Sequence, residues 1–217
     1  MRNGDNISDV AALGVDWIGM IFWSKSPRCV KMIPTHAGTI PDRGSVNTTD
    51  AKHETKLVGV FVDDTSQNII TRLVNYGLDI IQLHGNETPT QIKNLRATIV
   101  PDIKPDIKII KAISVEKPED IEHYRRYEDC VDYFLFDTKC NSVGGSGEQF
   151  DWSVLDRYHG DTPFLLSGGI GPDDAQRIKD FYHPKMIGID INSQFETQPA
   201  MKDVSLISTF ISQLANE

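Results

Sequence analysis

Short apolar runs alternate with helix-forming segments along nearly the whole chain, and this alternation limits the possible fold more than any other feature. The apolar runs have the length of strands and lie at residues 16–22, 57–62, 79–83, 108–113, 131–136, 163–166 and 186–191. Runs that are apolar throughout suit strands that are buried on both faces. Strict strand–helix alternation predicts a parallel sheet, either doubly wound or closed as a (β/α)8 barrel.

Residues with capping preferences mark helices between the strands. Ser66 is expected to cap a helix that ends at Gly77, because glycine readily adopts the left-handed conformation of a helix end. Thr88 and Pro89 have the pattern of a cap and a first helical turn. Pro172 opens another helix, and the two aspartates after it are favourable at the positive end of the helix dipole.

The chain opens with a helical pattern, at residues 6–13, that Gly14 is placed to end. A barrel normally starts with a strand, so seven strands with eight helical slots predict a (β/α)8 TIM barrel whose first strand is missing. Residues 34–56 have no apolar stripe and are predicted to form a loop, and residues 201–214 are predicted to form the last helix. Residues 1–217 are expected to form a single domain.

The composition narrows the class of partner. A net charge of −9 disfavours nucleic acid and anionic membranes, which both require clustered Lys and Arg, and no apolar run is long enough to cross a bilayer. The three cysteines lack paired spacing, so neither a disulfide framework nor a metal site is expected. These features predict a cytoplasmic protein. A phosphorylated small molecule remains a suitable ligand, because backbone N–H groups at a helix start bind phosphate locally.

Asp137 is the first candidate for a catalytic residue. It ends an apolar strand, and Gly144, Gly145 and Gly147 follow in a loop whose backbone can approach a ligand closely. An isolated aspartate in such a place is more often a turn residue. Polar residues at the other strand ends favour the catalytic role, because the carboxyl ends of barrel strands meet at one face.

The remaining candidates also follow strands. The loops after strands seven and eight of a barrel frequently bind phosphate, and the corresponding segments here contain small or polar residues, which predicts a phosphate cradle. Arg28, in a Ser-Pro-Arg turn, is the best candidate for a carboxylate clamp, because the guanidinium fork matches a carboxylate. The candidates for substrate binding are Arg28, Gln82, His84, Gly168, Gly169, Asp190, Asn192 and Ser193. For His84, a supporting or core role is the more common one.

Six ordered blocks resemble one family across essentially the whole chain. They are GVDWIGMIFWSKSPRCV, LVGVFVD, IIQLHGNE, FLFDT followed by GGSGEQFDW, LLSGGI and DINSQFE. Together they resemble phosphoribosylanthranilate isomerase of tryptophan biosynthesis. The resemblance implies a cofactor-free, monomeric aldose–ketose isomerase that performs an Amadori rearrangement of N-(5-phosphoribosyl)anthranilate.

The resemblance also implies roles for individual residues. Asp137 aligns with the general acid that opens the ribose ring, and Arg28 aligns with the arginine that recognises the anthranilate carboxylate. The residues that align with the phosphate cradle are Gly168, Gly169, Asn192 and Ser193. Gln194 stands where the family usually has glycine.

The general base of the family is a cysteine in a first-strand motif of the form K-V-C-G, and the sequence begins just past it. Cys29, Cys130 and Cys140 do not match that position, and Cys140 has no neighbouring cation that would activate it. The 217-residue sequence is therefore expected to have little or no isomerase activity.

Two alternatives compete with this interpretation. The first is another phosphate-binding barrel enzyme, similar to indoleglycerol-phosphate synthase or to the tryptophan synthase α-type proteins. Those enzymes use lysine or glutamate at strand ends, and the one lysine in such a place, Lys111, is expected to be an interior or rim residue. The second alternative is a non-catalytic barrel that binds phosphate and anthranilate.

Overall fold

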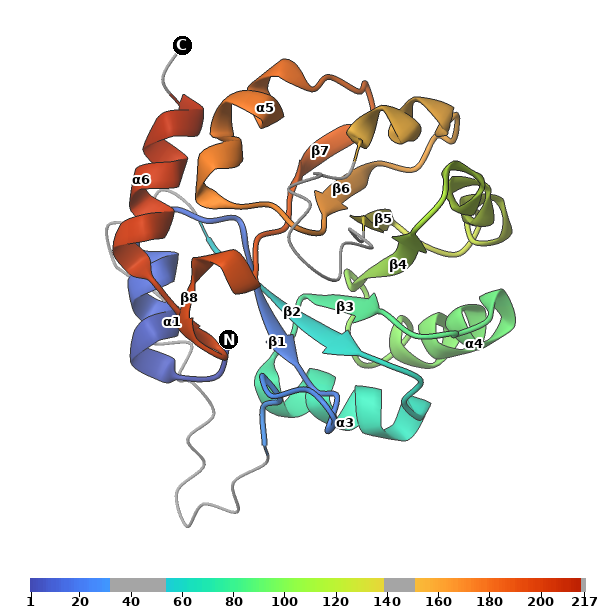
Figure 1. The fold of residues 1–217 in the computed structure, drawn as a ribbon. Helices are drawn as coiled ribbons and strands as arrows, with labels where there is room; N and C mark the ends of the chain where they lie inside the picture. The colour runs from blue at the N-terminus through green and yellow to red at the C-terminus, as the bar shows by residue number, and fades with distance from the viewer. Residues whose placement is uncertain (32–53, 139–150, 216–217) are drawn as a thin grey trace.

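The computed structural model describes residues 1–31, 54–138 and 151–215 (Figure 1). Seven strands form one parallel sheet, and their order in the sheet is their order in the chain. The strands are β1 (Trp17–Ile21), β2 (Lys56–Phe61), β3 (Ile80–Leu83), β4 (Lys108–Val115), β5 (Tyr133–Thr138), β6 (Phe164–Ser167) and β7 (Met186–Ile189). All seven coincide with the predicted runs to within a few residues at their ends.

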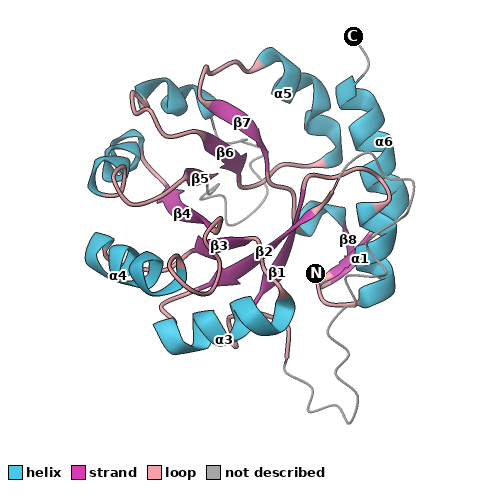
Figure 2. Cartoon of the chain, turned by 180° about the vertical axis from the view of Figure 1, so that it is seen from behind, coloured by secondary structure: helices cyan, strands magenta, loops and turns pink. Residues whose placement is uncertain are grey.

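The sheet is curled, with β1 and β7 as its two edge strands, and the helices lie on its outer side (Figures 1 and 2). Such a sheet is an incomplete (β/α)8 barrel. Within the described ranges no eighth strand joins β7 to β1, which agrees with the predicted barrel that lacks one strand. The helices of the described chain include none that is long and apolar enough to cross a membrane.

The helices are α1 (Gly4–Ala11), α3 (Ser66–Tyr76), α4 (Pro89–Ile99), α5 (Ala175–Asp180) and α6 (Val204–Ala215). Shorter 3-10 segments are η1 (Pro118–Arg126), η2 (Trp152–Arg157), η3 (Pro172–Asp174) and η4 (Ser193–Phe195). Thr88 caps α4 as predicted, in a reciprocal capping box with Gln91. Gly77 ends α3 with a left-handed φ of 58°.

Three predicted boundaries were wrong. The cap of α3 is Thr65 rather than Ser66, because the Thr65 side chain accepts from the Asn68 N–H group. The first helix starts at Gly4, two residues before the predicted range of 6–13, because the side chain of the preceding asparagine caps it. The helical start predicted at Pro172 is confirmed, because the 3-10 turn η3 begins there and continues as α5.

The third error concerns the end of the chain. Residues 201 and 202 belong to β9 (Met201–Lys202), which pairs antiparallel with β8 (Glu196–Gln198), and α6 begins only after them. Asp203 separates the two elements, because its side chain accepts from the Leu206 N–H group at the start of the helix. The predicted loop at 34–56 falls mostly outside the described residues, and its last residue already belongs to β2.

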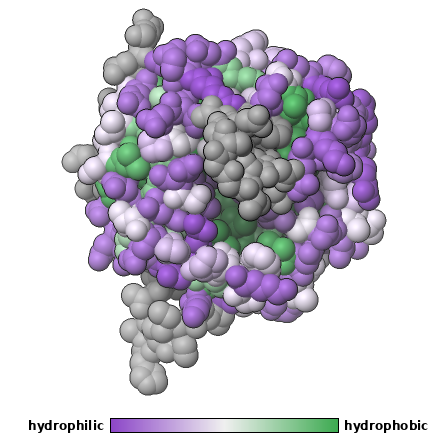
Figure 3. Space-filling view, viewed as in Figure 1, coloured by the Kyte–Doolittle hydropathy of each residue, from purple (hydrophilic) through white to green (hydrophobic). Residues whose placement is uncertain are grey.

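Side chains alternate between two hydrophobic cores. The cluster inside the curled sheet contains Val58, Ile80, Ile110, Ala112, Leu135 and Leu165. A larger cluster fills the space between the sheet and the surrounding helices, and Phe61, Phe134 and Phe136 are fully buried there. Each such phenylalanine contributes about 1.5–3 kcal/mol. The face seen in Figure 3 is mainly hydrophilic, and a hydrophobic hollow lies near its centre.

Candidate functional site

Alternation along the strands directs the polar residues at their carboxyl ends toward the barrel interior. Ile80, Leu135 and Leu165 belong to the inner core. Residues two positions further along a strand point to the same face. These residues are Gln82 on β3, Asp137 on β5 and Ser167 on β6.

Asp137, His84 and Gln82 form a hydrogen-bonded chain at this end. The Gln82 Nε2 atom lies 3.1 Å from His84 Nδ1, and His84 Nε2 lies 3.3 Å from Asp137 Oδ2. An amide nitrogen only donates, so His84 Nδ1 accepts and the neutral ring carries its proton on Nε2. His84 therefore donates to Asp137. This contact places the predicted acid beside a histidine that β3 and its loop hold in position.

Asp190 follows β7 on the other side of Asp137. The Ser167 hydroxyl donates to Asp190 Oδ2 at 2.9 Å. Asp190 is partly open to solvent. The protein atoms around its carboxyl group still remove part of its hydration, and this desolvation raises the pKa of the carboxyl. The negative charge of Asp137 raises it further, whereas the hydrogen bond from Ser167 lowers it. The carboxyl ends of β3, β5 and β7 thus place His84, Asp137 and Asp190 at the same end of the barrel, where the charges of His84 and Asp137 act on Asp190.

The predicted phosphate cradle has the backbone geometry that glycine permits. Gly168 and Gly169 follow β6 with φ angles of 97° and 66°, which side-chain-bearing residues rarely adopt. Asn192 and Ser193 follow the adjacent strand β7, and both are exposed. The loops of two neighbouring strands therefore present backbone and small polar groups at the same end of the barrel.

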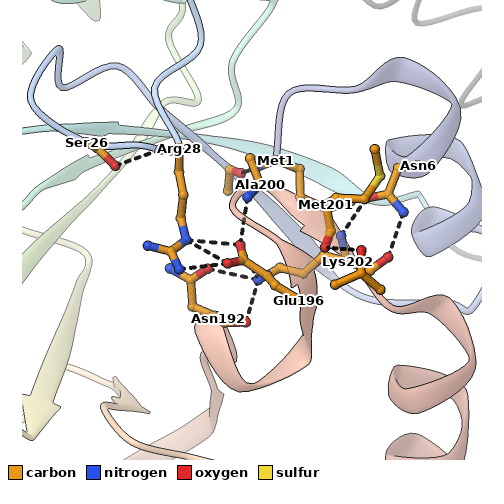
Figure 4. A network of polar contacts seen from close by, with 11 residues as sticks. Met1, Asn6, Ser26, Arg28, Asn192, Glu196, Ala200, Met201 and Lys202 are labelled. Carbon is orange, nitrogen blue, oxygen red and sulfur yellow. Dashed lines mark hydrogen bonds and ion pairs between the residues drawn. The ribbon is translucent and has the colours of Figure 1, made fainter.

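Arg28 lies in the turn after β1, but its guanidinium is not isolated. Its Nε atom donates to both carboxylate oxygens of Glu196, at 3.0 and 2.8 Å, and its Nη2 atom lies 2.7 Å from Glu196 Oε2 (Figure 4). Glu196 and Lys202, which contact each other, were not predicted as site residues. Their only signal in the sequence is their place after the DINS motif, and that place does not indicate that Glu196 pairs with Arg28.

Lys111 does not reach the site. It follows Ile110 on β4, and because successive side chains of a strand point to opposite faces, Ile110 points into the barrel and Lys111 points outward. It is buried, with 3% of its side chain exposed, and its Nζ atom donates to the Leu83 and Gly85 carbonyls and to Glu87 Oε2. This confirms the expected interior position. Burial lowers the pKa of Lys111, and the Glu87 charge opposes that shift. The two carbonyls flank His84, so the ion pair fixes the loop that carries this histidine.

No described cysteine lies at the site. Cys29 and Cys130 are buried, and the Cys130 thiol donates to the Tyr127 carbonyl at 3.1 Å. Burial raises the pKa of the Cys130 thiol, which makes it less reactive. Cys140 lies outside the described residues. Within the described ranges, no three His, Cys, Asp or Glu side chains are grouped closely enough to hold a metal ion.

The curled parallel sheet, with acid–base groups and a glycine cradle at the carboxyl ends of its strands, defines a TIM-barrel enzyme. Residues 2–213 match the sequence profile of the family described as N-(5'phosphoribosyl)anthranilate (PRA) isomerase. An N-(5'-phosphoribosyl)anthranilate isomerase from Parabacteroides distasonis is 45% identical over 99% of this chain and 90% of its own length. One from Phocaeicola vulgatus is 40% identical over 99% of this chain and 94% of its own.

The chain therefore belongs to the phosphoribosylanthranilate isomerase family. It is an isomerase of tryptophan biosynthesis that carries out an Amadori rearrangement. The two alternatives from the sequence, a different barrel enzyme and a non-catalytic binding protein, are not favoured.

Solved structures agree with this membership. A phosphoribosyl anthranilate isomerase in complex with reduced 1-(o-carboxyphenylamino)-1-deoxyribulose 5-phosphate superposes with a TM-score of 0.73 at 25% identity, over 99% of this chain and 94% of that chain. The enzyme from Thermotoga maritima superposes with a TM-score of 0.72 at 28% identity, over 99% of this chain and 95% of that chain. Another structure from this organism is described as monomers generated from a dimeric enzyme.

Proposed function

We propose that Asp137 is the general acid of the rearrangement, and the observation that carries this proposal is its place at the carboxyl end of β5, on the inner face of the barrel and beside His84. His84 contacts Oδ2, so Oδ1 is the oxygen left to face the substrate. Protonation of the ribose ring oxygen by this group opens the furanose ring. Because Gln82 holds His84 in one tautomer, the carboxyl group keeps a fixed orientation during the transfer.

The carboxylate and the phosphate of the substrate bind on either side of this acid in the proposed arrangement. Arg28 contacts the anthranilate carboxylate through the edge of its guanidinium that Glu196 does not occupy. The phosphate contacts the backbone of Gly168 and Gly169 and the residues Asn192 and Ser193, while Asp190 faces the sugar. The left-handed glycine backbone supports the phosphate position, because it permits close approach of an anion to N–H groups.

Asp137→Asn tests the assignment of the acid. Asparagine keeps the shape of the side chain and removes the acidic proton. Turnover of phosphoribosylanthranilate, measured in the chain extended at its N-terminus by a strand of the K-V-C-G form, should therefore fall by about 100-fold or more. Affinity for the reduced carboxyphenylamino-deoxyribulose phosphate should change little. Asp173→Asn, on the exposed surface of η3, is the matched control. Turnover within about threefold of the starting protein would refute the assignment.

The enzyme is further proposed to act as a monomer in the cytoplasm. Its membership of an amino-acid biosynthetic family supports the location. A related enzyme from Thermotoga maritima is described as dimeric, so the stoichiometry is decided by measurement. Sedimentation equilibrium at micromolar concentration measures the mass directly, and a value twice the chain mass of 24.3 kDa would contradict the monomer.

A further inference from the structure

A buried ion network links the two ends of the proposed substrate site (Figure 4). At one end, Glu196 holds the guanidinium of Arg28 through three contacts of 2.7–3.0 Å. The Glu196 side chain is 4% exposed and that of Arg28 is 24% exposed. One edge of the guanidinium fork is therefore fixed in the protein interior, while the arginine itself keeps access to solvent.

At the other end, Lys202 holds the residue proposed to contact phosphate. Its Nζ atom donates to the carbonyl and side-chain oxygens of Asn192, at 2.7 and 2.8 Å, and to Glu196 Oε1 at 3.3 Å. These three acceptors use all three protons of the ammonium group. The backbone of Lys202 is fixed as well, because Asn6 on α1 exchanges two hydrogen bonds with it, at 2.9 and 2.8 Å.

The network contains two cations and one carboxylate. Burial raises the pKa of Glu196, but the hydrogen bond from Arg28 and the charge of Lys202 lower it more, so the net shift is downward. Burial lowers the pKa of Lys202, and Glu196 only partly offsets that shift. The carboxylate gains from two cations, and the charge of Asp190 also raises the pKa of Lys202.

We propose that Glu196 and Lys202 are positioning residues that hold Arg28 and Asn192 in one rigid frame and thereby set the distance between the carboxylate and phosphate groups of an accepted ligand. This inference rests on the proposed roles of Arg28 and Asn192. A buried ion pair is weak evidence for stability alone, because an apolar pair of similar volume is often equally stable. Glu196 contacts Arg28 and Lys202 contacts Asn192, so positioning these two residues is a reason for a charged pair at this place.

Isothermal titration calorimetry with two ligands tests the frame. One is the reduced carboxyphenylamino-deoxyribulose phosphate, and the other is the same compound without the ring carboxylate. The dissociation constant of the carboxylate-free compound divided by that of the complete compound measures carboxylate recognition alone. Glu196→Gln should reduce this ratio by about 10- to 100-fold, since a charge-assisted pair is lost, and should change affinity for the carboxylate-free compound much less. Equal weakening of both ligands would overturn the proposal.

A matched control and a direct test of the clamp separate the possible failures. Asp161→Asn removes the carboxylate of an exposed ion pair with Lys185 and should leave the ratio unchanged. Arg28→Met should reduce the ratio at least as much as Glu196→Gln does. An unchanged ratio in Arg28→Met would overturn both the clamp and the frame. A reduced ratio in Arg28→Met with an unchanged ratio in Glu196→Gln would overturn the frame alone.

Conservative variants keep the test decisive if Glu196→Gln does not fold. Glu196→Asp retains the charge but shortens the reach, so the ratio should fall partway, and a wild-type ratio in the folded variant would contradict the frame. Lys202→Met should weaken binding of inorganic phosphate, and Lys202→Arg should restore part of it. Identical phosphate affinity in Lys202→Met and the starting protein would show that Lys202 does not position Asn192.

Discussion

The buried Lys111–Glu87 pair provides the sharpest stability prediction. Lys111→Met keeps the length and apolar stem of the side chain but removes its charge and three hydrogen bonds, of 2.7 to 3.2 Å, to Leu83, Gly85 and Glu87. Two of these bonds hold the carbonyls on either side of His84. The variant therefore removes the support of the loop that places this histidine beside Asp137.

The magnitude follows from the burial of the partner that remains. Glu87 is 7% exposed and would be left with the N–H groups of Asp63 and Gly85 as its remaining donors. Breaking a buried ion pair on one side costs about 3–5 kcal/mol. The lower end of this range is expected. Burial lowers the pKa of Lys111, which means that its charged form loses hydration, and part of the attraction to Glu87 only offsets that loss.

Urea unfolding followed by circular dichroism measures this cost. The matched control is Lys185→Met, which removes an exposed pair whose Nζ atom lies 3.0 Å from Asp161 Oδ1 and should cost about 0–1 kcal/mol. If Lys111→Met lowers the free energy of unfolding no more than Lys185→Met does, the buried pair does not hold the loop.

The double variant Lys111→Met with Glu87→Gln separates pairing from burial. Because Glu87→Gln removes the uncompensated charge, the double variant should be more stable than the sum of the two single changes by about 1–3 kcal/mol. Strict additivity would mean that the two side chains stabilise the protein independently of each other.

Three further changes have definite expected outcomes. Gly168→Ala should weaken binding of inorganic phosphate about tenfold, because a φ of 97° is strained for alanine. Gly4→Ala is the control, because a Cβ atom there meets nothing within 4 Å. Equal phosphate affinities of the two variants in calorimetry would contradict the cradle. Thr88→Ala removes the α4 cap and should cost about 1 kcal/mol in urea unfolding; no loss would mean that the capping box is not formed. The folded-state pKa of Glu196 lies below its ordinary value of 4.5, so its stabilisation is present above pH 4.5 and is lost as the pH falls through the lower value. The difference in unfolding free energy between Glu196→Gln and the starting protein should shrink across that window, and a constant difference would refute the linkage.

Local sequence was sufficient for the strands and for several helix boundaries. A run such as 131–136 is apolar on both faces, and a segment with that property has few stable places other than the middle of a parallel sheet. The cap at Thr88 and the stop at Gly77 depend on the residues next to them, and both were predicted correctly. The positions of Gln82 and Asp137 inside the barrel follow from alternation along strands that the sequence already indicated.

Local sequence was not sufficient where a partner lies far away in the chain. Arg28 and Glu196 are separated by 168 positions, and residues 201–202 of the hairpin that carries Glu196 were predicted to be helical. Two β-strands of three and two residues have too little periodicity to be recognised. Their pairing becomes favourable only when the chain returns beside β1.

The alternating apolar runs thus specified the curled sheet and brought the acid, the glycine pair and the arginine to the ends of its strands, because burial and alternation act over a few residues. The tertiary structure alone specified which charges face each other there. Lys202 meets Asn6 across 196 positions and meets Glu196 and Asn192 in the same buried network, and such contacts depend on where the closing segments pack rather than on any local pattern.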